Sequence, residues 1–168
     1  MNTNTQFSTS DLRKALGAFG TGVTVVTTIS EEREKIGVTA NSFSSVSLEP
    51  AIVLWSLKKQ SPSLKAFDVC GRFVVNILSL EQRDWSQRFA SSIPNKFESV
   101  STLEGLEGLP VLSNCAAVFQ CKTVERLEVG DHVLFLGQVQ AYHHTELPTL
   151  MFCRGNYVQG RELGTPTN

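Results

Sequence analysis

Apolar and β-branched residues occur in short runs along this chain, and charged or glycine-containing segments separate the runs. Residues 23–28 (VTVVTT) are almost all β-branched, which is typical of a β-strand. Residues 36–39 follow a charged turn at 31–35 and predict the returning strand of a hairpin. Residues 51–56 (AIVLWS) are apolar at nearly every position, as expected for a strand buried on both faces.

Four more runs continue this strand-rich pattern. Residues 72–78 and 116–125 each predict one strand. A long strand is expected at 132–143, with Gly137 marking a bulge or bend within it. Residues 149–153 predict the last strand of the chain.

Three short helices are predicted around these strands. The first has Ser8, Thr9 or Ser10 as its N-cap, since a hydroxyl suits that position, and Gly17 and Gly20 end it. The second covers residues 63–69, and the third covers 80–90 with Ser79 as its cap. Residues 91–110 contain two prolines and two glycines and are expected to form a loop.

The predicted elements number six or seven strands and two or three helices. The strands come in runs and do not alternate strictly with long helices, so a doubly wound parallel sheet is disfavoured. The pattern favours an antiparallel β-barrel with short α-helices packed outside it. We expect one domain over residues 8–160, with flexible termini at 1–7 and 161–168.

Composition narrows the class of protein. The 168 residues are 41% hydrophobic and 18% charged, with a formal net charge of −1. No basic patch suggests nucleic acid, and no apolar run is long enough to span a membrane. The start of the chain does not resemble a signal peptide, so we expect a cytoplasmic protein. The four cysteines lack metal-binding spacing and are interpreted as reduced core or near-core residues; they are Cys70, Cys115, Cys121 and Cys153.

Hydroxyl side chains cluster in two places where predicted strands end. Residues 39–47 (TANSFSSVS) follow one strand, and Ser56, Ser61 and Ser63 follow the next. Hydroxyls and loop N–H groups bind phosphate, and the amide of Asn41 offers a donor and an acceptor to a heteroaromatic ring. Taken alone, the same residues also fit solvated turns with local capping.

The remaining candidates leave similar alternatives open. His132 lies beside Asp131 at the start of the long strand. Asp131 could orient the imidazole ring of His132, or His132 could be an ordinary exposed histidine in a turn. Tyr157 would stack on a ligand ring or cover the core, and Arg88 would reach an anion or face solvent. Motifs for Rossmann and P-loop nucleotide binding are missing from the sequence.

Taken together, several segments of this sequence resemble those of a known protein family. Over about residues 12–157 the chain resembles the short-chain flavin reductase family, the reductase components of two-component flavin-dependent monooxygenases. The segments that carry the resemblance are GVTVVT at 22–27, GVTANSF at 37–43, PAIVLWS at 50–56, FVVNIL at 73–78, GDH at 130–132 and RGNY at 154–157.

The resemblance implies an FMN-binding split barrel that forms a homodimer. It implies that Thr39, Asn41 and Ser42 hold the flavin ring and the adjoining chain. The residues implied around the ribityl chain and phosphate are Ser56, Leu57, Ser61 and Ser63. His132 would meet the nicotinamide nucleotide, Arg154 and Tyr157 would close the site, and Arg88 and Phe89 would approach the flavin from a helix end.

The implied activity is hydride transfer from NADH, or less expectedly NADPH, to FMN or FAD. Reduced flavin would then pass to a separate flavin-dependent oxygenase. The alternative is an electron carrier that keeps FMN tightly bound and has no nicotinamide turnover. Neither reading needs a metal, a nucleic acid or a membrane.

Overall fold

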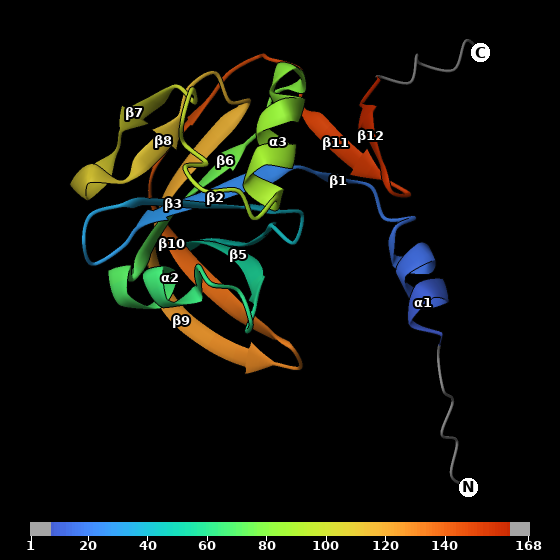
Figure 1. The fold of residues 1–168 in the computed structure, drawn as a ribbon, viewed down its shortest axis with the longest axis horizontal. Helices are drawn as coiled ribbons and strands as arrows, with labels where there is room; N and C mark the ends of the chain where they lie inside the picture. The colour runs from blue at the N-terminus through green and yellow to red at the C-terminus, as the bar shows by residue number, and fades with distance from the viewer. Residues whose placement is uncertain (1–7, 162–168) are drawn as a thin grey trace, which may run out of the picture.

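A curved antiparallel sheet forms the body of the protein in a computed structural model that describes residues 8–161 (Figure 1). In spatial order its seven strands are β3 (Lys35–Ala40), β2 (Thr24–Ile29), β6 (Arg72–Ile77), β9 (Ala117–Val129), β10 (His132–His144), β5 (Ala51–Lys58) and β4 (Ser44–Leu48). Every neighbouring pair is antiparallel. The predicted mainly β chain with a few helices is therefore confirmed.

The two edge strands of this sheet, β3 and β4, are consecutive in the chain. Only residues 41–43 join them. Seven flat strands would place their edges about 29 Å apart, whereas four Cα–Cα steps span at most about 14 Å. The sheet must therefore curl until its two edges approach one another.

The hydrophobic core follows from this curl, because alternate residues of a strand face opposite sides. On β2, Val26 faces the inside and Val25 the outside, and on β6 Val75 and Val74 divide in the same way. The inner cluster draws buried residues from six of the seven strands and from α2: Val26, Val38, Val53, Trp55, Leu57, Phe67, Phe73, Val75, Cys121, Val133 and Phe135. Such convergence of side chains from nearly all strands requires a rolled sheet.

Smaller elements cover the outer cluster and the ends of the sheet. The helices are α1 (Thr9–Leu16), α2 (Leu64–Cys70) and α3 (Arg83–Ala90), with 3-10 turns η1 (Leu80–Gln82) and η2 (Leu106–Gly108). A second sheet contains β1 (Thr21–Gly22), β11 (Leu150–Cys153) and β12 (Asn156–Gln159), and a third contains β7 (Thr102–Glu104) and β8 (Pro110–Leu112). Within residues 8–161, none of the helices is long and apolar enough to cross a bilayer.

Several local predictions are confirmed. The Ser8 hydroxyl accepts a hydrogen bond from the N–H of Asp11 at 3.3 Å, so it caps α1. The β9–β10 register shifts between Leu136 and Gly137, as a bulge requires. A Cβ on Gly137 would collide with the Phe73 ring and lie 2.9 Å from the Cβ of Cys121, so only glycine fits there.

Other local predictions are wrong. The hydroxyl-rich loop expected at 39–47 is mostly strand, because β3 runs to Ala40 and β4 starts at Ser44. The chain continues past the last expected strand into β12, and β7 and β8 lie within or beside the expected loop at 91–110. These strands are short or polar and lack an alternating pattern. Apart from Arg161, the termini expected to be flexible lie outside the described residues.

One buried amide joins three strands outside the inner core. Asn76 is fully buried, and its Nδ2 donates to the carbonyl of Val25 at 2.9 Å. Its Oδ1 accepts from the N–H of Leu112 at 2.9 Å. The side chain therefore ties β6 to β2 and β8, and it gives the N–H of Leu112 a buried partner.

Replacing Asn76 with alanine should lower the free energy of unfolding by about 2–4 kcal/mol, because it leaves the buried N–H of Leu112 without its partner, removes the bond to Val25 and opens a cavity. Urea unfolding followed by circular dichroism measures the change. Gln140→Ala, at an exposed position on β10, serves as the control and should change stability by less than about 0.5 kcal/mol. Equal stability of the two variants would contradict this role of Asn76.

Thiol chemistry provides a second check of the core. Burial raises the pKa of the Cys115 and Cys121 thiols from 9.0 to about 12, whereas Cys70 and Cys153 are half-buried. At pH 8, Ellman's reagent should label Cys70 and Cys153 quickly, and Cys115 and Cys121 only after unfolding. Rapid labelling of all four thiols would contradict the assigned burial.

The same two buried thiols should make stability depend on pH. Above pH 9 the unfolded chain releases the protons of Cys115 and Cys121 and the folded chain does not, so the free energy of unfolding should fall progressively between pH 9 and 12.

Candidate functional site

A pocket of about 760 Å³ opens beside the short link between β3 and β4. Its walls come from the ends of β3 and β5, the loop before α2, the end of α3 and the start of β10. Nine of the twelve residues predicted from the sequence line it: Thr39, Asn41, Ser42, Ser56, Leu57, Ser61, Ser63, Phe89 and His132. The curl of the sheet thus brings together segments that are far apart in the chain.

Ser42 fixes the link against β5. Its Oγ accepts from the N–H of Ser56 at 2.9 Å and donates to the carbonyl of the same residue at 3.2 Å. In the β4–β5 ladder Ser44 pairs with Leu54, so the serine hydroxyl continues the pairing one step beyond the strand. Ser42 therefore shapes the wall of the pocket, and its hydroxyl is already engaged.

Thr39 is also used structurally. Its hydroxyl donates to the carbonyl of Ser86 on α3 at 2.7 Å. Ser86 is buried, and its own hydroxyl lies 2.9 Å from that of Tyr157. These contacts join β3, α3 and β12, so they hold the helix end that carries Phe89 against the pocket.

Other polar groups remain available to a ligand. Within residues 8–161, the side chains of Asn41, Ser56 and Ser63 make no hydrogen bond to one another or to other protein groups. Lys58 and Lys96 also line the pocket and bring positive charge to it. The site therefore combines an amide, hydroxyls and two cations, a set suited to a phosphate-bearing ligand with a polar ring edge.

His132 stands at the rim, where β10 begins. Its Nδ1 lies 2.7 Å from Oδ1 of Asp131, and this hydrogen bond lowers the pKa of the Asp131 carboxyl. Because the carboxylate accepts, Nδ1 carries a proton and Nε2 is the ring nitrogen left for a ligand. The predicted orienting role of Asp131 is thus matched by a direct contact.

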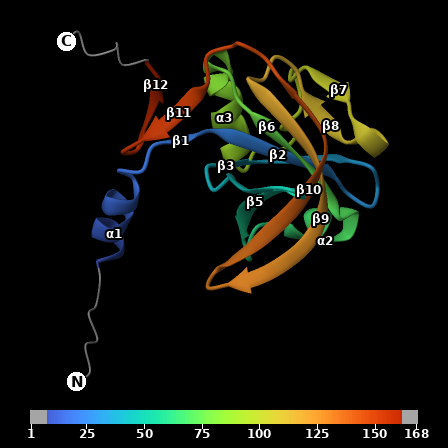
Figure 2. The same cartoon turned by 180° about the vertical axis from the view of Figure 1, so that it is seen from behind.

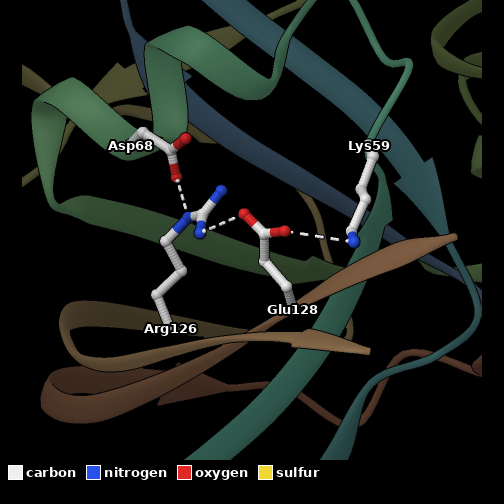
Figure 3. A network of polar contacts seen from close by, with 4 residues as sticks. All are labelled: Lys59, Asp68, Arg126 and Glu128. Atoms are coloured by element: carbon white, nitrogen blue, oxygen red, sulfur yellow. Dashed lines mark hydrogen bonds and ion pairs between the residues drawn. The ribbon is translucent and has the colours of Figure 1, made fainter. Parts of the chain in front are cut away.

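A row of charged side chains steadies the same end of the β9–β10 hairpin (Figure 3). Glu128 on β9 lies between two cations, with Lys59 Nζ at 3.1 Å and Arg126 Nη1 at 3.0 Å. Arg126 Nε reaches Asp68 Oδ1 on α2 at 2.7 Å. Hydrogen bonds from Lys59 and Arg126 lower the pKa of Glu128. Solvent screens each ion pair, so each contributes little to the free energy of unfolding. The contacts link the hairpin to α2 and to Lys59, which follows β5.

Three predicted residues do not line this pocket. Arg88 is half-buried on α3 but faces elsewhere. Tyr157 contacts α3, where Arg83 lies 5.3 Å from the centre of its ring. Arg154 lines a neighbouring pocket of about 850 Å³, which shares Asn41 with the first. Their predicted contact with flavin stays a prediction.

Lys58 and Lys96 are functional candidates that the sequence did not reveal. Lys96 lies after α3, within the loop that the sequence predicts at 91–110. Its only signal was a single lysine in a serine-rich stretch, which is too common to identify a site. No cluster of three or more potential metal ligands occurs in the described part of the chain.

The chain belongs to the family described as flavin reductase like domain, whose profile matches residues 16–161. A probable flavin reductase from Rhizobium meliloti is 42% identical over 94% of this chain and 51% of its own length. FMN reductase (NADH) SmoA from Agrobacterium fabrum is 39% identical over 86% of this chain and 82% of its own length. The flavin-dependent monooxygenase reductase subunit HsaB of Mycobacterium tuberculosis is 35% identical, with coverages of 90% and 82%.

Solved structures agree with this assignment. The flavin reductase PheA2 has a TM-score of 0.84 and 37% identity, covering 93% of this chain and 100% of that one. Streptomyces globisporus SgcE6, an NADH:FAD oxidoreductase in complex with NAD and FAD fragments, has a TM-score of 0.84 and 32% identity, with coverages of 95% and 94%. The chain spans only 51%, 66% and 47% of three of the curated relatives that it matches.

Ser42→Ala should loosen the link, because it removes both side-chain hydrogen bonds to Ser56. We expect a loss of about 1–2 kcal/mol in unfolding free energy and about tenfold faster hydrogen exchange at the Ser56 amide. Exchange monitored by NMR gives the local effect, and urea unfolding gives the global one. Ser45→Ala, at an exposed position on β4, is the matched control. Unchanged exchange at Ser56 in the Ser42 variant would refute the assignment.

Proposed function

We propose that this chain is an NAD(P)H-dependent flavin reductase that transfers hydride from NADH to FMN or FAD. The observation that carries the proposal is the single pocket that gathers nine residues expected to handle flavin and nucleotide. Family membership supports it, as do relatives named FMN reductase (NADH) and NADH:FAD oxidoreductase.

The pocket residues fit a flavin. A volume of about 760 Å³ lies within the range of roughly 300–1,000 Å³ that small-molecule sites occupy. The amide of Asn41 matches the donor and acceptor edge of the flavin ring, and Leu57 and Phe89 supply apolar walls. Ser56, Ser63 and Lys58 would hold the phosphate, which needs hydroxyl and cationic partners.

The protein's own part in the reaction is alignment. Hydride passes between the nicotinamide and flavin rings when the two lie face to face. Thr39 and Ser42 keep the pocket wall fixed through their bonds to Ser86 and Ser56. His132, held by Asp131, would orient the nicotinamide nucleotide through Nε2. No acid–base pair is needed, because the two bound rings supply the chemistry.

The finer architecture belongs to the same proposal. We take residues 8–160 as one split-barrel domain, supported by the short link between the two sheet edges. We also propose a homodimer. Helix α1 stands away from the sheet in both views (Figures 1 and 2) and buries none of its residues. Leu16 and Phe19 are 66% and 80% exposed, and a second copy would cover them.

The expected redox partner is a separate flavin-dependent oxygenase that receives reduced flavin. The relative HsaB, named a monooxygenase reductase subunit, supports this assignment. A cytoplasmic location agrees with the four free cysteines, since thiols persist in reducing compartments.

Turnover tests the proposal directly. The purified chain should oxidise NADH catalytically when FMN or FAD is added, and each combination of FMN or FAD with NADH or NADPH should be assayed. A protein that retains yellow flavin but does not oxidise NADH would instead support the electron carrier. A colourless protein that is inactive with every combination would refute both functions.

His132→Ala should raise the KM for NADH by about tenfold and change kcat by less than about threefold, because a binding and orienting contact is lost. Steady-state kinetics at saturating flavin separates the two constants. His143→Ala is the control, since His143 is exposed further along β10. An unchanged KM in the His132 variant would exclude this role.

A further inference from the structure

Lys59 connects two walls of the proposed flavin pocket. It follows β5 and begins the pocket loop, which we define as residues 59–63. The other four residues of this loop line the pocket, whereas the side chain of Lys59 turns to Glu128 on β9 (Figure 3). The backbone N–H of Lys59 donates to the carbonyl of Asp131 at 3.0 Å. One residue is therefore bonded both to β9 and to the turn that precedes His132.

The turn that carries His132 is otherwise surrounded by solvent. It contains two residues, Gly130 and Asp131, because Val129 and His132 pair with each other in the β9–β10 ladder. Gly130 has a positive φ of 56°, and a Cβ placed on it would meet no atom of the described chain within 4 Å. The side chain of Asp131 is 86% exposed. The bond from Lys59 therefore constrains the position of this turn beyond its own two strands.

Glu128 contacts Lys59 from the other face of the hairpin. Glu128 pairs with Val133 in the ladder, so its side chain lies on the same face as this fully buried residue. His132 precedes Val133, and its side chain therefore lies on the opposite face. The route from Glu128 to His132 passes through Lys59 and the turn, and not through the pocket.

A further ion pair fixes the far end of the pocket loop. Helix α2 starts at Leu64, directly after the loop, and its Asp68 accepts a hydrogen bond from Nε of Arg126 at 2.7 Å. Arg126 Nη1 also lies 3.0 Å from Glu128. The loop is thus attached to β9 on both sides, and Glu128 contacts the cation at each attachment.

We propose that Glu128 is a positioning residue for the nicotinamide nucleotide. Its carboxylate binds the ammonium group of Lys59, the N–H of Lys59 binds the Asp131 carbonyl, and the Asp131 carboxylate orients His132. The inference rests on the proposed function, which assigns the nucleotide to His132. Solvent screens the ion pair, so the expected effect is about fivefold in KM and not a loss of the fold.

Glu128→Ala tests the proposal, because charge and position predict opposite results. Removing a carboxylate makes the chain less negative, which alone would favour anionic NADH and lower its KM. Loss of the contact with Lys59 should instead raise the KM for NADH about fivefold and change kcat by less than about twofold. Steady-state kinetics at saturating flavin measures both constants. Glu125→Ala, which removes the same charge from an exposed position on β9, is the matched control and should not raise KM.

Double variants test the route of the effect. In the His132→Ala background, Glu128→Ala should raise KM by less than a further factor of about two, because the residue through which it acts is gone. Lys59→Met retains the backbone N–H and should raise KM on its own. Adding Glu128→Ala to Lys59→Met should then have little further effect, because both changes break the same ion pair.

Two measurements on the free chain need no turnover. Hydrogen exchange at the Lys59 amide, followed by NMR, should be about fivefold faster in Glu128→Ala than in wild type or Glu125→Ala. Flavin affinity, measured by quenching of flavin fluorescence, should change by less than about twofold. Thermal melting confirms that each variant is folded.

An unchanged or lower KM for NADH in Glu128→Ala would overturn the proposal. The same conclusion would follow if the rise persisted in full in the His132→Ala background, or if flavin affinity fell as much as KM rose, because Glu128 would then support the pocket in general. If wild type oxidises NADH and Glu128→Ala behaves like it, only this inference fails. If wild type neither binds flavin nor oxidises NADH, the proposed function fails as well.

Discussion

The three-residue connection between β3 and β4 is the constraint on which the rest of this structure depends. It joins strands at opposite edges of a seven-stranded sheet, and three residues are long enough to do so only if the sheet is rolled. Rolling gathers the inner core around Trp55, and it also brings the ends of β3, β5 and β10 to one place. Core and pocket are therefore two results of one geometric requirement.

The polar residues around the pocket divide into two groups with different tasks. The hydroxyls of Thr39 and Ser42 form hydrogen bonds to backbone carbonyls and hold the pocket walls in place. Asn41, on the same short link, is exposed and keeps its amide for a ligand. A site built in this way positions its ligands in advance, which suits a reaction in which two bound rings supply the chemistry.

Much of this arrangement could be predicted from the sequence, because the central strands are strongly β-branched and the pocket residues fall in recognisable segments. Residues 23–28 and 51–56 both correspond closely to strands. Sequence reasoning failed where local pattern was weak: β4 is rich in serine, and β7, β8 and β12 are only three or four residues long. Lys96 was missed because its position depends on a tertiary contact with Phe89, which no local pattern encodes.

The burial of Cys115 and Cys121 has a consequence for the resistance of this protein to oxidation. Free reduced flavin reacts with oxygen to give hydrogen peroxide, so the function proposed above would expose this chain to its own oxidant. Peroxide attacks the thiolate form, and thiols with pKa values of about 12 supply almost none at neutral pH. Damage should therefore begin at the half-buried Cys70 and Cys153, at the margins of the fold, while the packing around Cys115 and Cys121 remains intact.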